Sequence, residues 1–98
     1  MNNIEFLQEW FVSQCDGDWE HNFGITVETL DNPGWGVFID LRGTSIEGVS
    51  FEPVEEKRSE NNWLSCCINE GRFEGFGGPV NLMEILGVFK RYCLMMNQ

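Results

Sequence analysis

The chain has few basic residues and a single histidine. Six Lys and Arg stand against 16 Asp and Glu in 98 residues, which gives a formal net charge of −10. A field of this sign repels phosphate backbones and anionic membranes, so we expect neither nucleic-acid nor membrane binding. The same field would attract a cationic partner and speed its encounter, or would simply keep a small protein in solution.

The sequence also lacks the motifs of metal-binding sites, phosphate-binding loops and membrane-spanning segments. Cysteines occur at 15, 66, 67 and 93, without a CxxC pair or a second histidine, so no zinc spacing is present. There is no GxSxG, HExxH or phosphate loop, and no apolar run approaches the ~20 residues that span a bilayer. The start, MNNIEFLQEW, has no basic region followed by an apolar block. We therefore expect a cytoplasmic protein with reduced thiols, no cofactor and no metal.

The apolar content predicts a folded chain with a helix at each end. Hydrophobic residues make up 42% of the sequence, and we expect residues 1–98 to form a single domain. The segment Ile4–Cys15 has helical periodicity, with Ile4, Leu7 and Phe11 on one apolar face beside Trp10. Its cap is Asn2 or Asn3, and Asp16-Gly17 ends it. A capping box of Asn81 with Glu84 starts the second helix. Its predicted buried stripe is Leu82, Ile85, Leu86, Phe89, Cys93 and Met96.

In the middle of the chain the period changes to two and predicts a hairpin. Apolar residues alternate over 23–30 and 35–41, and "DNPG" lies between the two segments. The apolar faces coincide only if odd residues pair with odd, which predicts Val27 opposite Ile39. The loop then holds three residues, 32–34, or five, because the residue before proline resists the helical region. We expect Val27 and Ile39 to be buried, and Glu28 and Asp40 to be exposed.

The remaining elements complete an α+β fold. Strands are predicted at 49–54 and 63–68, and a short strand at 72–76 is placed at an edge. The charged segment 55–62 is predicted as an exposed loop, and "GFGGP" (75–79) as a mobile connector. The expected architecture is a single two-layer domain, with the N- and C-terminal helices packed on one face of an antiparallel sheet of about four to five strands.

The segment "DGDWEH", residues 16–21, gathers three carboxylates, a tryptophan and the only histidine. His21 next to Glu20 is a poor catalytic pair, because neighbouring side chains in extended chain diverge. Trp19 is either a structural staple or a partner contact. By its place in the alternation, Phe38 points to the sheet face opposite the core, near Thr26 and Glu28. An exposed aromatic side chain there would suit a binding anchor, unless a helix covers that face.

Two segments together resemble a known family. The stretch "LQEWFVSQCDGDWEHNFGITVETLDNPGWGVFIDL", residues 7–41, closely resembles the immunity protein 53 family of bacterial polymorphic-toxin systems. Weaker similarities, "NNWLSCCINEGRFEGFGG" and "LMEILGVFKRY", follow in the same order. The resemblance implies a cytoplasmic antitoxin that binds and neutralises a toxin domain encoded nearby, without catalysis of its own.

Charge and resemblance together give two functional hypotheses. The first is stoichiometric blockade of a basic toxin, such as a nuclease, through a partner-binding set of Asp16, Asp18, Trp19, Glu20, His21, Glu28, Asp31 and Phe38. The second is a small thiol or histidine enzyme, similar to a sulfurtransferase, that would use Cys66, Cys67 or His21.

Overall fold

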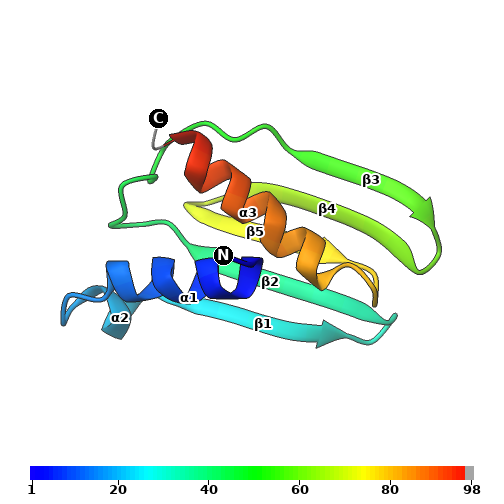
Figure 1. Cartoon of the computed structure of the whole chain (residues 1–98), viewed down its shortest axis with the longest axis horizontal. Helices are drawn as coiled ribbons and strands as arrows, with labels where there is room; N and C mark the ends of the chain where they lie inside the picture. The colour runs from blue at the N-terminus through cyan, green and yellow to red at the C-terminus, as the bar shows by residue number, and fades with distance from the viewer. Residues whose placement is uncertain (97–98) are drawn as a thin grey trace.

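A five-stranded antiparallel sheet carries two helices on one of its faces (Figure 1). The computed structural model describes residues 1–96; the predicted place of Met96 in the apolar stripe lies outside the described side chains. The strand order is β1-β2-β5-β4-β3, and the predicted fold class is confirmed. The elements are α1 (Asn3–Gln14), α2 (Trp19–Asn22), β1 (Ile25–Leu30), β2 (Gly34–Asp40), β3 (Val54–Ser59), β4 (Asn62–Asn69), β5 (Arg72–Gly77) and α3 (Leu82–Met96).

Helix α1 begins as predicted but presents a different face to the core. Asn2 caps it in a capping box, with Oδ1 accepting from Glu5 N at 2.8 Å. Ile4, predicted on the same apolar face as Leu7 and Phe11, is 54% exposed. The packed residues are Phe6, Leu7 and Trp10, because α1 lies against α3 as well as over the sheet. The Trp10 ring meets the Phe89 ring edge-on at 5.1 Å.

The β1–β2 hairpin has the predicted parity but a shifted register. Val27 pairs with Val37 and Leu30 with Gly34, so the three-residue loop is 31–33 instead of 32–34. Gly34 is not the left-handed residue of the turn. Instead, a Cβ at this position would overlap the carbonyl oxygen of Gly77, so the glycine allows β2 to approach β5 closely.

Two predictions of side-chain exposure in the hairpin are correct and two are wrong. Ile39 is fully buried, and Glu28 is exposed. Val27 is 45% exposed, because β1 is an edge strand and α1 covers only its beginning (Figure 1). Asp40 is half-buried, because its carboxylate pairs with Arg42 at 2.6 Å.

The second half of the sheet differs most from the prediction. The segment 49–53 is not a strand, although Val49 and Phe51 pack on the core as loop residues. Strand β3 begins at Val54, the last residue of the predicted strand, and continues into the segment predicted as a charged loop. A two-residue turn connects it to β4. As the outer strand, β3 exposes Glu55 through Ser59, and therefore it shows no alternation of apolar and polar residues.

Strand β5 is the central strand, not the predicted edge. Gly75 and Gly77 belong to it, so the prediction of a mobile connector is also wrong. A Cβ on Gly77 would lie 2.9 Å from Cδ1 of Ile85, which shows how tightly α3 sits on this strand. The absent side chains let the helix approach the sheet backbone closely.

Helix α3 supplies most of the helical part of the core. Ile85, Leu86, Phe89 and Cys93 are buried as predicted, and Val88 and Tyr92 are buried with them. None of the helices among the described residues combines the length and apolarity needed to cross a bilayer.

A buried asparagine fixes the start of α3. Asn81 Oδ1 accepts from Trp63 N at 3.1 Å, so its side chain links the residue before α3 to strand β4. Its Nδ2 donates to Glu84 at 2.9 Å and to Asn62 at 3.0 Å. Asn81 and Glu84, which were predicted to form a capping box, are therefore joined side chain to side chain, in place of the side-chain-to-amide bonds of such a box.

Candidate functional site

The structure distributes the predicted site residues over three places. Asp16 through His21 form the corner between α1 and β1. Asp31 lies in the β1–β2 turn, at the opposite end of the long axis (Figure 1). Glu28 and Phe38 lie on the sheet face that the helices leave uncovered. The eight residues therefore do not form one continuous site.

Two carboxylates of the corner accept hydrogen bonds from backbone amides. Asp16 Oδ1 accepts hydrogen bonds from the amides of Asp18 and Trp19, both at 2.9 Å. Glu20 accepts from the amides of Asp16 at 3.0 Å and Gly17 at 2.8 Å. Amide hydrogen bonds favour the charged carboxylate, so those from Trp19 and Asp18 lower the pKa of Asp16. The pKa of Glu20 is lowered by its own backbone amide first, and then by the amides of Asp16 and Gly17. Gly17, with φ of +91°, makes the tight loop possible.

Trp19 is a core residue of this corner. Its side chain is 4% exposed, and its indole Nε1 donates to the carbonyl oxygen of Arg42 at 2.8 Å. The ring packs edge-on against Trp10, with centroids 5.9 Å apart. The side chain thus joins α1 to the sheet and has little surface for a partner. In this corner, Asp18 and His21 remain exposed.

The uncovered sheet face, called here the open face, has an aromatic centre. Phe38 and Phe76 meet edge-on with ring centroids 5.5 Å apart, and the Arg72 guanidinium lies 4.8 Å above the Phe38 ring. All three side chains are half-buried. By strand parity, the open face includes Thr26, Glu28, Phe38, Asp40, Glu55, Lys57, Trp63, Ser65, Cys67, Arg72, Glu74 and Phe76.

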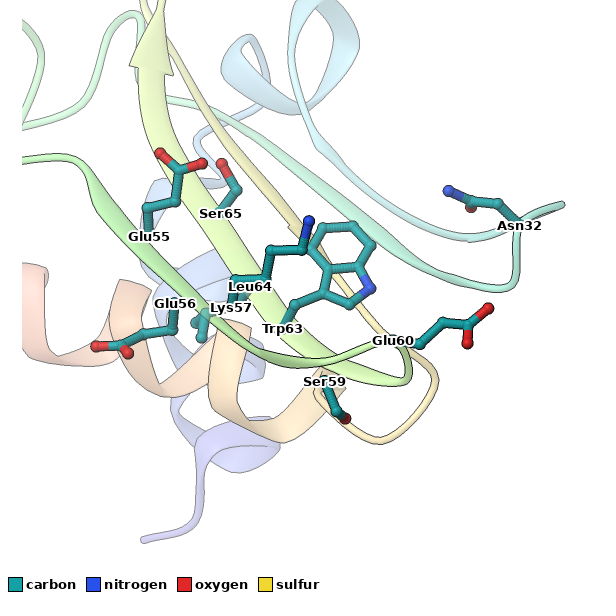
Figure 2. A pocket seen from close by; sticks show the side chains of 9 residues that line it. All are labelled: Asn32, Glu55, Glu56, Lys57, Ser59, Glu60, Trp63, Leu64 and Ser65. Carbon is teal, nitrogen blue, oxygen red and sulfur yellow. The ribbon is translucent and has the colours of Figure 1, made fainter.

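A hollow of about 420 Å³ lies at one end of the open face (Figure 2). Lys57 and Trp63 face each other across β3 and β4, and Figure 2 shows them side by side, with Glu56 and Ser59 turned away. Asn32, from the β1–β2 turn, borders the hollow on the far side. The hollow is open and combines an aromatic ring with charges of both signs, which suits a protein side chain.

Two acids of the open face are already neutralised. Asp40 pairs with Arg42 at 2.6 Å, and Glu74 pairs with Arg72 at 2.7 Å. Among the described residues, neither Glu28 nor Glu55 takes part in an ion pair. Glu28, one of the predicted contact residues, is therefore a carboxylate that a cationic partner can reach.

The thiols and the histidine do not form a catalytic group. Burial raises the pKa of Cys66 to about 12 and the pKa of Cys93 to about 12, so both stay protonated at neutral pH. Cys67 points to the open face and is half-buried, while His21 is exposed at the distant corner. No group of three or more possible metal ligands occurs in the part of the chain that the structure describes.

Sequence reasoning missed Phe76 and Trp63. Phe73 and Phe76 have opposite parity in one strand, so one of them must leave the core. Likewise, Leu64 and Cys66 alternate as core residues and place Trp63 on the other face. That signal was present in the sequence, but the glycines around Phe76 concealed the strand.

Fold and surface together describe a small binding domain: one sheet face is packed under helices, and the other displays aromatic and charged side chains. The family model of immunity protein 53 matches residues 4–93, and the chain belongs to this family. No curated protein and no solved structure matches the chain. It is thus an immunity protein of a polymorphic toxin system, a non-enzymatic inhibitor that binds a cognate toxin. The alternative of a thiol or histidine enzyme is wrong.

Proposed function

We propose that the chain neutralises its toxin in the cytoplasm by stoichiometric binding through the open face. The observation that carries this proposal is the Phe38–Phe76 pair, which lies half-buried at the centre of a face that no helix covers. Aromatic side chains surrounded by polar ones are typical of the energetic centre of protein interfaces. Glu28 lies on the same face, one strand towards the edge.

The proposed partner is a basic toxin, such as a nuclease. The chain carries a net charge of −10, and ion pairs in the described residues occupy only three of its 16 acids. The unpaired carboxylates create a field that accelerates the approach of a basic surface. This attraction is screened beyond ~8 Å at physiological salt, so it governs the association rate more than the lifetime of the complex.

Co-purification from the native operon tests the binding itself. The chain, tagged and expressed together with its neighbouring genes, should retain the toxin domain in a 1:1 complex, measured by light scattering after size exclusion. If no toxin is retained, or the complex lacks a fixed stoichiometry, blockade by binding is refuted.

Truncation of aromatic side chains tests the surface. Phe38→Ala and Phe76→Ala should each weaken toxin binding by about 2 kcal/mol or more, mainly through faster dissociation. Phe23→Ala is the matched control, because Phe23 is also half-buried and lies under a guanidinium, that of Arg42, but belongs to the corner. Full affinity in folded Phe38 and Phe76 variants would place the contact elsewhere.

A further inference from the structure

The two edges of the sheet are built differently. Strand β3 has four consecutive charged residues, Glu55 to Arg58, and a register shift between Lys57 and Ser59. Both features discourage the addition of another strand. Strand β1 contains Glu28 as its one charged residue, has no proline and pairs with β2 in six consecutive positions. Its outer edge therefore lacks the protection that β3 has.

The backbone of β1 has hydrogen-bonding groups that point away from the sheet. Asp40 N donates to Gly24 O at 3.1 Å, so this pair is a hydrogen-bonded one. Hydrogen-bonded and non-hydrogen-bonded pairs alternate along an antiparallel ladder. The N–H and C=O groups of Ile25, Val27 and Thr29 consequently face outward, where an added strand would bind them.

An apolar groove of about 310 Å³ lies beside this edge, on the helix side. It is lined by Ile4, Leu7, Gln8, Phe11 and Ile25. Ile4 is 54% exposed, and Val27, on the same face of β1 as Ile25, is 45% exposed. Side chains on one face of an added strand would enter the groove and cover both residues.

We infer that the β1 edge binds an extended segment of the toxin in which apolar residues alternate with basic ones. The apolar side chains would face the groove, and the basic ones would lie on the open-face side next to Glu28. Asp31, at the end of β1, adds a second carboxylate. A second copy of the chain would pair less well, because each copy carries a net charge of −10.

This inference depends on the proposed function, since the occupant is the toxin. Strand addition also fits the open face, because a strand added at β1 widens the same surface and leaves only β1 between the toxin strand and Phe38. The two proposals nevertheless involve different atoms: backbone groups of β1 in one, and aromatic side chains of β2 and β5 in the other.

Amide hydrogen exchange tests the inference directly. In the complex with the co-purified toxin domain, the outward amides of Val27 and Thr29 should exchange at least about tenfold more slowly than in the free chain. The β3 edge should not change. Unchanged exchange at Val27 and Thr29 in a complex at saturation overturns the inference. Protection that rises with concentration in the toxin-free chain, together with a dimer in sedimentation, would identify a second copy as the occupant and also overturn it.

Two substitutions test the same surface independently. Val27→Pro removes an outward N–H that takes no part in the β1–β2 ladder, and edge strands tolerate proline at such positions. Ile4→Gln places a polar group in the groove, and its control is Val12→Gln, because Val12 is 64% exposed on the same helix but does not line the groove. Val27→Pro and Ile4→Gln should each weaken toxin binding at least about tenfold, whereas Val12→Gln should not.

The outcomes separate the two proposals. If Val27→Pro and Ile4→Gln bind the toxin like the wild type while Phe38→Ala does not, the edge inference is wrong and the open face stands. Should Val27→Pro fail to fold, the Ile4→Gln and Val12→Gln pair and the exchange measurement still decide the question.

Discussion

Gly75, in the central strand, lies directly beneath Ile85 of α3, so close that a Cβ at position 75 would overlap Cγ2 of the isoleucine. The contact explains why a glycine-rich segment lies at the centre of the sheet instead of in a loop. The helix rests on backbone at this point, with the Ile85 side chain directly against the strand.

Gly75→Ala should therefore destabilise the fold by roughly 1–3 kcal/mol, because the added methyl group forces α3 away from β5. Gly24→Ala is the control, since a Cβ at Gly24 meets no atom within 4 Å. It should be neutral, or stabilise by up to about 1 kcal/mol through the unfolded chain. Urea unfolding measures both variants, and equal stability of the two would contradict the close contact.

Ile39 and Val27 have the same parity in paired strands but should respond differently to truncation. Ile39→Ala removes a fully buried side chain and should cost roughly 2–5 kcal/mol in the free energy of unfolding. Val27→Ala, at the partly exposed edge, should cost less than about 1 kcal/mol. A large loss at Val27 in the free chain would mean that the edge is already covered.

Trp19→Ala should lower stability by roughly 3–5 kcal/mol, because it removes the ring that joins α1 to the sheet. Any loss of toxin binding should follow the loss of folded protein. His21→Ala, at an exposed position two residues away, should leave the melting temperature unchanged. Measuring melting temperature and toxin affinity on the same samples would expose a direct contact: a folded Trp19→Ala protein with normal stability but reduced affinity.

Glu84 should contribute to stability in acid. Hydrogen bonds from Arg58 and then Asn81 lower its pKa from about 4.5 to about 2, with Arg58 Nη2 at 2.6 Å. Because the pKa is depressed in the folded state, the contribution is complete above about pH 4.5 and disappears as the pH falls towards 2. The side chain is 38% exposed, so solvent screening limits the effect to less than about 1 kcal/mol.

Urea unfolding of the Glu84→Gln variant between pH 5 and pH 2 tests the contribution of the Glu84 carboxylate to stability. The stability difference from the wild type should be present at the upper end of that range and shrink on acidification. Glu9→Gln, on the exposed side of α1, serves as the control for removing one negative charge. A Glu84→Gln difference that stays constant with pH would show that the ion pair does not stabilise the fold.

Local patterns in the sequence were sufficient for the two terminal helices and for the parity of the first hairpin, but not for the short helix α2. The cap at Asn2, the stripe through Ile85 and Phe89, and the odd-with-odd parity of β1 and β2 all follow from spacing, since each depends on residues close in the chain. The exact register did not follow, because Gly34 is not part of the turn. A glycine is needed there so that β2 can lie close to Gly77, which is distant in the sequence. Strand β3 was missed because an edge exposed on both faces has no period to detect.

The candidate site was predictable only in part. Phe38 and Glu28 were placed on the correct face by parity alone. Trp19 was not assigned, because its burial depends on contacts with Trp10 and the carbonyl of Arg42, which sequence spacing does not reveal. The Phe38–Phe76 pair required knowing that β5 lies beside β2, a contact between segments more than 30 residues apart in the sequence.

Because β5 is the central strand, the sheet cannot be completed during synthesis until β5 has been made. Strand β2 pairs only with β1 until β5 has been made, and β5 ends at Gly77. A nascent chain that has not reached this residue exposes the inner edge of β2 and lacks α3, so neither face of its hairpin is covered. Pairing over such a separation is slow to form and is exposed to aggregation until it closes. A fragment that ends before β5 therefore leaves the inner edge of β2 unpaired, and we expect such a fragment to give no protection against the toxin.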